Sequence, residues 1–188
     1  MASTLVYLHV EATDLFPDNW IYVHDPELQA GRITNFRNWS PQLYGNANTS
    51  ILTLEYWSYD DSPLWGMPDT NLISLASHEM QRTGLLNGAP ILDGKVVRIR
   101  RCYPVYDKGC AEHVAAIRSY LSEIDGLTVI GRYGAFKYNN QDHSMLMGLL
   151  AAERLTQNAD HQLWDINTDY DQYQEATLIT DTGLVRTS

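Results

Sequence analysis

The run Leu5-Val-Tyr-Leu-His-Val10 is apolar at nearly every position. Apolar side chains on both faces are typical of a strand inside a sheet, so we expect an interior strand rather than a free edge. Four more strand-like runs follow at residues 20–24, 32–36, 51–57 and 95–103, and turn-rich pieces separate them. This part of the chain therefore predicts a mainly antiparallel sheet.

Three helical patterns accompany the strands. Pro68-Asp-Thr70 is a helix start, and apolar residues recur at helical spacing from there until Gly84. A second amphipathic pattern covers Ala111–Ser122, and a third begins soon after Asp142. Before the third, the short apolar run Leu127-Thr-Val-Ile130 is bounded by glycines and predicts a short strand. The expected fold class is therefore α+β.

The order of these elements divides the chain into three parts. Residues 1–126 hold the predicted sheet and its flanking helices, and residues 127–156 form a strand, a loop and a helix. Residues 157–188 are polar and aromatic without periodicity, and we expect a C-terminal tail that lies over another surface.

The charge balance restricts the partners of the protein. The formal net charge is -10, from 23 acidic and 13 basic residues. An acidic chain is repelled by nucleic-acid phosphates and anionic membranes, so we expect neither as a partner. Basic residues cluster only at residues 97–101, which indicates either the solvated edge of a strand or a ligand site.

The two cysteines and the first ten residues give information on the cellular location of the protein. Cys102 and Cys110 have no paired C-x-x-C spacing and no second cluster, so no zinc site is expected. The first ten residues lack a positively charged leader followed by a long apolar run. We expect a cytoplasmic protein with reduced thiols and without a transmembrane helix.

The segment Gly131–Met145 holds the highest density of polar residues that could bind a ligand or take part in a reaction. It joins the predicted strand to the third helix, whose first turn presents backbone N–H groups to an anion or an electron-rich ring edge. Asp142 is expected to cap this helix. The small residues Gly148, Ala151 and Ala152 would let a flat ring approach one side of the helix closely. The alternative is an ordinary capped helix after a surface loop.

The same segment carries a family resemblance. The stretch Leu127–Leu155 contains the short motifs Gly-Arg-Tyr-Gly, Lys-Tyr and Asn-Gln-Asp-His-Ser. It resembles the C-terminal flavin motif of UDP-galactopyranose mutases, especially the eukaryotic type, and of related amine-oxidase-like bacterial proteins. Residues 18–26, 31–41 and 101–106 also resemble the substrate-domain strands of that family. The resemblance spans most of the chain.

The resemblance implies FAD as the cofactor, with the loop along the isoalloxazine and the helix N-terminus at its pyrimidine edge. The matching candidate cofactor-binding residues are Gly131, Arg132, Asn140, Gln141, Asp142, His143, Ser144 and Met145. It also implies that Arg32, Tyr103 and Tyr138 approach a substrate diphosphate, and Tyr106 is a further candidate for substrate binding. Guanidinium and phenol donors suit phosphate oxygens. Arg32 as a strand surface residue, and Tyr103 and Tyr106 as packing aromatics, remain alternatives.

A dinucleotide-binding turn is missing from the sequence. No two of the 12 glycines are separated by a single residue, so no G-x-G-x-x-G exists and no complete Rossmann unit is expected. We expect either a truncated product of a longer flavoprotein or a short natural protein. The latter would borrow a dinucleotide-binding half from a partner, or form a homo-oligomer.

Two classes of function follow. The first is the substrate- and flavin-facing part of an FAD-dependent enzyme, expected to be inactive without a dinucleotide-binding half. It would act on a small molecule, either as an amine-oxidase-like oxidoreductase or as a mutase acting on a nucleotide sugar. The second is a non-catalytic binding or assembly module derived from such a flavoprotein. The catalytic residue stays unknown, and no metal ligand spacing such as H-E-x-x-H or hydrolase G-x-S-x-G occurs.

Overall fold

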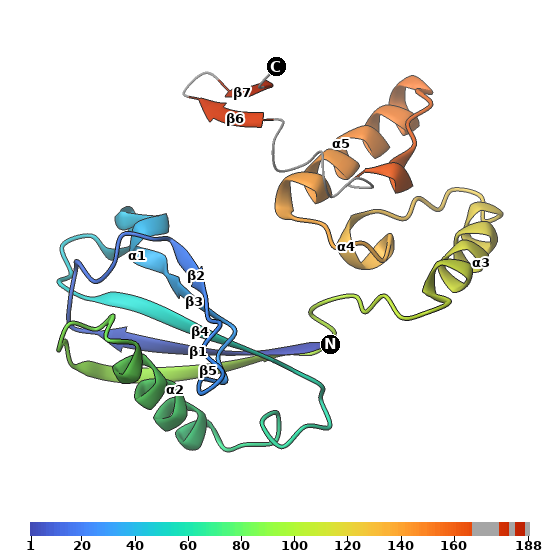
Figure 1. Ribbon diagram of the computed structural model, residues 1–188. Helices are drawn as coiled ribbons and strands as arrows, with labels where there is room; N and C mark the ends of the chain where they lie inside the picture. Colours follow the sequence, from blue (N-terminus) through green and yellow to red (C-terminus); the bar gives the residue numbers. More distant parts are fainter. Residues whose placement is uncertain (167–176, 181–182, 187–188) are drawn as a thin grey trace. The chain divides into compact units, whose positions relative to one another are not determined.

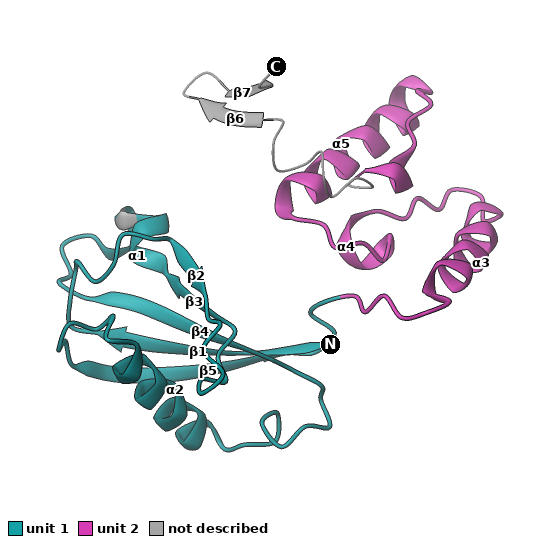
Figure 2. Cartoon of the chain, viewed as in Figure 1, with its two compact units in different colours: residues 1–103 teal, residues 104–188 magenta. Residues whose placement is uncertain are grey.

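The computed structural model describes residues 1–166, 177–180 and 183–186. The chain forms two compact units, Met1–Tyr103 and Pro104–Ser188 (Figure 2). Much of the expected C-terminal tail lies outside the described residues, namely 167–176, 181–182 and 187–188. The division into parts at residues 126 and 156 stays a prediction.

The first unit is built on a five-stranded antiparallel sheet with the strand order β2-β3-β4-β1-β5 (Figure 1). The strands are β1 (Ala2–Val10), β2 (Trp20–Tyr22), β3 (Arg32–Asn35), β4 (Ser50–Ser58) and β5 (Ile91–Ile99). The short helical turns α1 (Phe36–Trp39) and η1 (Pro41–Tyr44) join β3 to β4. The predicted α+β class and the antiparallel sheet are confirmed.

Burial on the two faces of β1 differs from the expectation. β1 lies between β4 and β5, as predicted for an interior strand. However, from Leu5 onward only its even-numbered side chains are fully buried, whereas Leu5, Tyr7 and His9 are half-buried. Helix α2 (Asp69–Thr83) packs against the even-numbered face, and the opposite face carries no such cover within this unit. A run that is apolar at nearly every position therefore forms one fully buried face and one partly exposed face of the sheet. We call the partly exposed face the half-open face.

The core between α2 and the sheet is apolar with one buried carboxylate. Val6, Leu8 and Leu54 meet Leu72 and Met80, and all five are fully buried. Burial of such side chains stabilises each by about 1.5–3 kcal/mol relative to exposure. This core fixes α2 on one face, so that residues on the other face are available for contacts.

Glu79 ties α2 to the sheet and to the loop before β3. Its carboxylate accepts hydrogen bonds from the Tyr56 hydroxyl at 2.8 Å and from the backbone N–H groups of Gln29 at 2.6 Å and Ala30 at 3.2 Å. Burial raises the pKa of the Tyr56 phenol well above its usual range, and the adjacent Glu79 carboxylate adds to this. The Glu79 carboxylate thus has a structural role, because it connects α2 to β4 and to the loop before β3.

The end of β5 differs from the predicted strand at residues 95–103. β5 pairs with β1 from Val10 opposite Ile91 to Ser3 opposite Ile99, so its bounds are set by the length of β1. Beyond that point Arg101 adopts a positive φ of 53° and turns the chain. β5 is one of the two edge strands, which agrees with a solvated edge for the basic cluster at residues 97–101.

The second unit is mainly helical. It contains α3 (Cys110–Ser122), α4 (Gly131–Gly134), α5 (Gln141–Gln157) and η2 (Leu163–Asp165). A two-stranded antiparallel hairpin, β6 (Thr177–Thr180) with β7 (Gly183–Arg186), follows in the segment expected to lack periodic structure. The helices predicted at residues 111–122 and after Asp142 are confirmed. Among the described residues, no helix is both long and apolar enough to cross a bilayer.

Two local predictions in this unit are wrong. The run Leu127–Ile130 is not a strand: Ile130 has extended dihedrals, φ -137° and ψ 167°, but the run pairs with no described strand. Extended backbone becomes a strand only with a neighbour to complete its hydrogen bonds. The segment after it, expected as a loop, begins with the short helix α4. α3 also leaves its apolar stripe uncovered, since none of its residues is buried.

Candidate functional site

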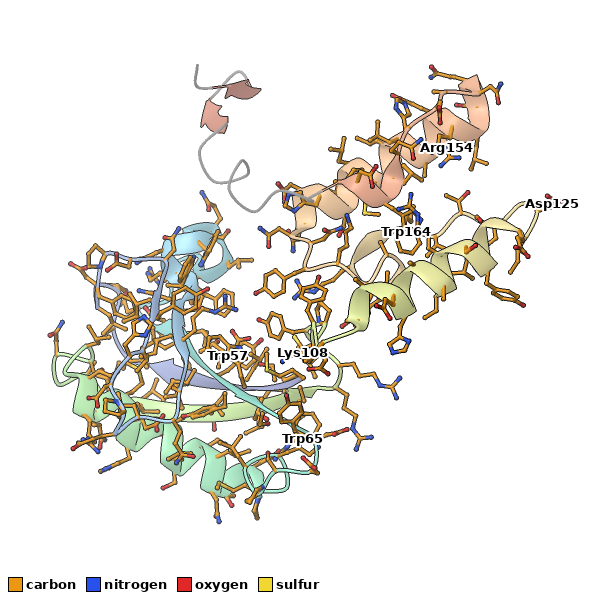
Figure 3. All side chains as sticks on the ribbon, turned by 45° about the vertical axis from the view of Figure 1, so that its right-hand side comes forward. Trp57, Trp65, Lys108, Asp125, Arg154 and Trp164 are labelled. Carbon is orange, nitrogen blue, oxygen red and sulfur yellow. The ribbon has the colours of Figure 1, made fainter. Side chains whose placement is uncertain are left out.

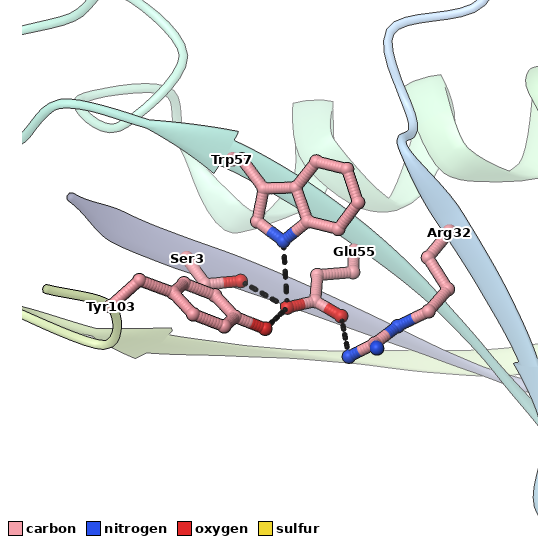
Figure 4. Close-up of polar contacts among 5 residues, drawn as sticks. All are labelled: Ser3, Arg32, Glu55, Trp57 and Tyr103. Atoms are coloured by element: carbon pink, nitrogen blue, oxygen red, sulfur yellow. Dashed lines mark hydrogen bonds and ion pairs between the residues drawn. The ribbon is translucent and has the colours of Figure 1, made fainter. Parts of the chain in front are cut away.

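A second buried carboxylate, Glu55, gathers polar side chains on the half-open face of the sheet (Figure 4). Its Oε1 accepts hydrogen bonds from Ser3 Oγ at 3.1 Å, Trp57 Nε1 at 2.9 Å and the Tyr103 hydroxyl at 2.8 Å. Its Oε2 accepts from Nη2 of Arg32 in an ion pair. We call these five residues the Glu55 cluster.

Sheet register brings the cluster together. Arg32 lies opposite Glu55 across β3 and β4, and Ser3 lies opposite Trp57 across β1 and β4. Tyr103 follows the end of β5, where its backbone N–H bonds the Met1 carbonyl at 3.4 Å. Leu54 and Tyr56 point into the core, so alternation along β4 turns Glu55 to the opposite face.

Arg32 holds its charge in this setting and is partly exposed. Burial opposes the charge of the guanidinium, but the adjacent Glu55 carboxylate outweighs it and raises the pKa of Arg32. The side chain is 29% exposed, and its Nε is buried without a hydrogen-bond partner in the described part of the chain. A fixed guanidinium of this kind can bind the oxygens of a phosphate or carboxylate.

Aromatic rings lie next to Arg32. The Arg32 guanidinium carbon lies 6.0 Å from the Trp20 ring centroid, and Trp20 meets Tyr22 edge-on at 4.8 Å. Tyr22 lies 6.2 Å from Trp57, and a Cβ on Gly31 would lie 2.2 Å from the Trp57 ring. The absence of a side chain at Gly31 therefore leaves room for this indole just before β3. Exposed aromatic faces beside a cation suit a ring-bearing anionic ligand.

In the second unit, the N-terminus of α5 is organised by a capping box. Asn140 is the N-cap: its side chain accepts from the His143 backbone N–H, and His143 Nδ1 accepts from the Asn140 N–H at 3.1 Å. The predicted cap at Asp142 is wrong, because Asp142 already lies within the first turn while Asn140 has the extended dihedrals of a cap. Two reciprocal hydrogen bonds thus close the helix end, and its first turn presents N–H groups.

The loop between α4 and α5 is fixed by Arg132. Its Nη1 donates to the Asn139 carbonyl at 2.9 Å, and its guanidinium carbon lies 4.6 Å from the centre of the Tyr138 ring. The buried Asn139 side chain in turn contacts Met147 Sδ at 3.1 Å, which fastens the loop to α5. Gly131 begins the element with φ 80°, a conformation that L side chains rarely adopt.

Tyr106 and Tyr138 also meet in this unit. The Tyr106 hydroxyl accepts the Tyr138 backbone N–H at 2.8 Å and lies 3.5 Å from the Phe136 carbonyl. A pocket of about 900 Å³ adjoins them, lined among others by Tyr106, Arg118, Phe136, Lys137 and Trp164. The Arg118 guanidinium carbon lies 5.4 Å from the Trp164 ring centroid. The Trp164 side chain is labelled in Figure 3. Burial lowers the pKa of Lys137, partly offset by Asp165.

The structure thus sorts the candidate residues into two sets. Arg32 and Tyr103 share one carboxylate in the first unit, and Tyr106 and Tyr138 share one hydrogen bond in the second. The eight candidate cofactor-binding residues lie in α4, the following loop and the first turns of α5: Gly131, Arg132, Asn140, Gln141, Asp142, His143, Ser144 and Met145. Their binding roles stay predictions. No cluster of three or more metal-ligating side chains occurs within the described ranges.

Sequence reasoning missed Glu55, Trp57 and Trp20. One signal was available for Glu55, the single charged residue within the mostly apolar run Ile51–Trp57. A charge inside a predicted strand with few polar neighbours requires donors from elsewhere in the fold. The identity of those donors could not be deduced, because they lie 52, 23 and 48 residues away, at Ser3, Arg32 and Tyr103.

The fold and the polar clusters define an α+β protein with an antiparallel sheet and a separate helical unit. No protein-family model matches the chain, and no curated protein matches it either. Among solved structures it is similar to a crystal structure of reduced UDP-galactopyranose mutase, with a TM-score of 0.74 and 22% sequence identity. The match covers 88% of this chain and 35% of that one. At this identity the likeness shows a shared fold.

Proposed function

We propose that the chain is the flavin- and substrate-facing part of an FAD-dependent enzyme related to UDP-galactopyranose mutase. The observation that carries the proposal is the α4–α5 element, in which a loop held by Arg132 leads into a capped helix N-terminus. The fold shared with the mutase over 88% of the chain supports it. The match covers only 35% of that mutase, so the whole enzyme would also need a dinucleotide-binding part.

The residues of α4 and α5 fit the reactive end of a flavin. Reduction places negative charge on the pyrimidine side of the ring system, and the first turn of α5 offers N–H groups and partial positive charge to it. Gly148 has no neighbouring atom within 4 Å of an added Cβ, which leaves room beside the helix. Bound FAD would supply the redox or nucleophilic chemistry. The protein would orient it and stabilise its charge.

The Glu55 cluster favours a phosphate-bearing substrate. Arg32 is a permanent cation with an anchored guanidinium, and exposed aromatic rings lie next to it. A nucleotide sugar offers both phosphate oxygens and rings to such a surface. This supports mutase chemistry over removal of hydride from an amine, which would require no phosphate contact.

FAD titration tests the flavin site. We expect the purified chain to quench added flavin fluorescence, and Gln141→Asp to weaken FAD binding because it adds a negative charge at the first turn of α5. The added charge should lower the affinity by about five- to tenfold, equal to about 1 kcal/mol for a charge in the first turn. Thr70→Asp adds a similar exposed charge to the first turn of α2 and is the matched control.

The controls decide between outcomes. Thr70→Asp should bind FAD as the wild type does. Equal affinities in the wild type and Gln141→Asp would remove α5 from the flavin site. A wild-type chain that leaves flavin fluorescence unchanged would favour the second candidate, a non-catalytic assembly module. Exposed apolar side chains on α3 and α5, including Ile117 and Leu149, are the observation that favours that module.

A further inference from the structure

Two candidate substrate residues of the first unit depend on the same buried acid. The Tyr103 hydroxyl donates to Glu55 Oε1 at 2.8 Å, and the Arg32 guanidinium pairs with Oε2. Each carboxylate oxygen therefore fixes one of the two groups that would meet the ligand (Figure 4). Nothing in the proposed function by itself requires an acid next to an anion-binding arginine.

We propose that Glu55 is a positioning residue, which fixes the Arg32 guanidinium and the Tyr103 hydroxyl for a ligand that carries a diphosphate. The inference rests on the proposed function for the identity of the ligand. Its geometric part, the control of Arg32 by Glu55, stands on the hydrogen bonds alone.

The side-chain entropy of arginine explains why such a residue is useful. A free arginine side chain carries about 2 kcal/mol of rotamer entropy, part of which is lost when it binds a ligand. The ion pair anchors Nη2 of Arg32 before any ligand arrives, while the side chain stays 29% exposed. The guanidinium is thus oriented in advance, and binding orders it less.

The donors of Glu55 separate positioning from simple structural support. Glu79, in the same unit, accepts from two backbone N–H groups and from Tyr56, and holds α2 in place. Glu55 instead accepts from four side chains, on the sheet face that α2 does not cover. A buried ion pair is weak support for stability, because apolar residues of similar volume often serve as well. The arrangement therefore points to control of side-chain direction.

The substitution Glu55→Gln gives a test in which charge and positioning predict opposite results. Glutamine keeps the size and one acceptor oxygen but loses the ion pair with Arg32. Charge alone would make the cluster more positive and tighten the binding of an anion. Loss of positioning weakens it. We expect the affinity of the full chain for UDP, measured by calorimetry, to fall about tenfold.

Two variants and one ligand-free measurement make the test decisive. Glu79→Gln should lower the unfolding temperature but leave UDP affinity unchanged, and Arg32→Ala should abolish UDP binding. In nitrogen-15 NMR, the side-chain signals of Arg32 should be slowly exchanging in the wild type and averaged in Glu55→Gln.

The outcomes separate the inference from the proposed function. If Arg32→Ala no longer binds UDP but Glu55→Gln binds it as tightly as the wild type or more tightly, the positioning role alone is overturned. A wild type that does not bind UDP would overturn the phosphate-binding part of the proposed function. In that case the NMR signals decide: averaging in Glu55→Gln supports control of Arg32 by Glu55, and unchanged signals overturn it.

Discussion

At the level of single residues, the first unit buries two carboxylates that differ in the origin of their donors. Glu79 accepts from two backbone N–H groups, whose positions the fold sets whatever side chains they carry, and from one side chain, the Tyr56 hydroxyl. Glu55 uses the side chains of Ser3, Trp57, Tyr103 and Arg32. The backbone donors of Glu79 agree with a structural role, and the side-chain donors of Glu55 are the basis of the positioning role proposed for it.

The Tyr56 phenol should make the free energy of unfolding of the first unit fall as the pH rises in the alkaline range. Burial first, and then the Glu79 carboxylate, raises its pKa far above the usual value of 10.0. Because the folded-state pKa exceeds the unfolded-state value, the contribution of this phenol is complete below pH 10.0 and is lost as pH rises above it. Above that pH, the wild type should lose about 1.4 kcal/mol more unfolding free energy per pH unit than Tyr56→Phe.

Urea unfolding between neutral pH and pH 11 measures this difference. At neutral pH, Tyr56→Phe should be less stable by about 1–3 kcal/mol, because Glu79 then lacks one buried donor. Tyr59 is exposed, so Tyr59→Phe should retain the wild-type pH slope. Identical slopes in the wild type and Tyr56→Phe would contradict the role of this phenol.

At the level of elements, the sequence predicted α2, α3 and α5 well because their start signals and periodicity are local. The short strand at Leu127–Ile130 failed for the opposite reason: a strand is defined by its partner, and apolar residues alone do not provide one. The cap of α5 was placed two residues too late. Asn140 and Asp142 are both good cap residues, and only the dihedral angles distinguish them.

The capping box gives a prediction for α5. Asn140→Ala removes the side-chain acceptor and should destabilise the first turn of α5 by about 1 kcal/mol. Amide hydrogen exchange at His143 and Ser144 should therefore become several-fold faster. Asn140→Ser keeps an acceptor and should restore most of the protection. Asp142→Ala should have the smaller effect, and a larger effect from Asp142→Ala than from Asn140→Ala would contradict the assigned cap.

At the level of the whole molecule, the two units differ in how completely they bury apolar side chains. The first unit has a closed core between α2 and the sheet. In the second unit, large apolar side chains stay exposed along α3 and α5, among them Ile117, Tyr120, Met145, Leu149 and Leu155. Large apolar side chains exposed in such number are typical of a contact with another protein surface.

We therefore expect the isolated chain to self-associate. Sedimentation velocity at micromolar to millimolar concentrations should show species larger than a monomer. The double substitution Ile117→Lys with Leu149→Lys should shift the distribution toward the monomer. Leu92→Lys, at an exposed site on the edge strand of the first unit, is the matched control and should not. A wild-type chain that stays monomeric over this range would contradict the expectation.

The sequence by itself determined the α+β class, the interior position of β1, three helices and the polar segment from Gly131 to Met145. These features depend on neighbours a few residues apart, through side-chain periodicity and capping. Tertiary structure alone decided which side chains share a carboxylate. Arg32, Ser3 and Tyr103 lie 23, 52 and 48 residues from Glu55, and sheet register, set by the packing of one face on α2, brings them to it. A charge inside a strand signals that donors must exist, but only the pairing of strands determines which residues supply them.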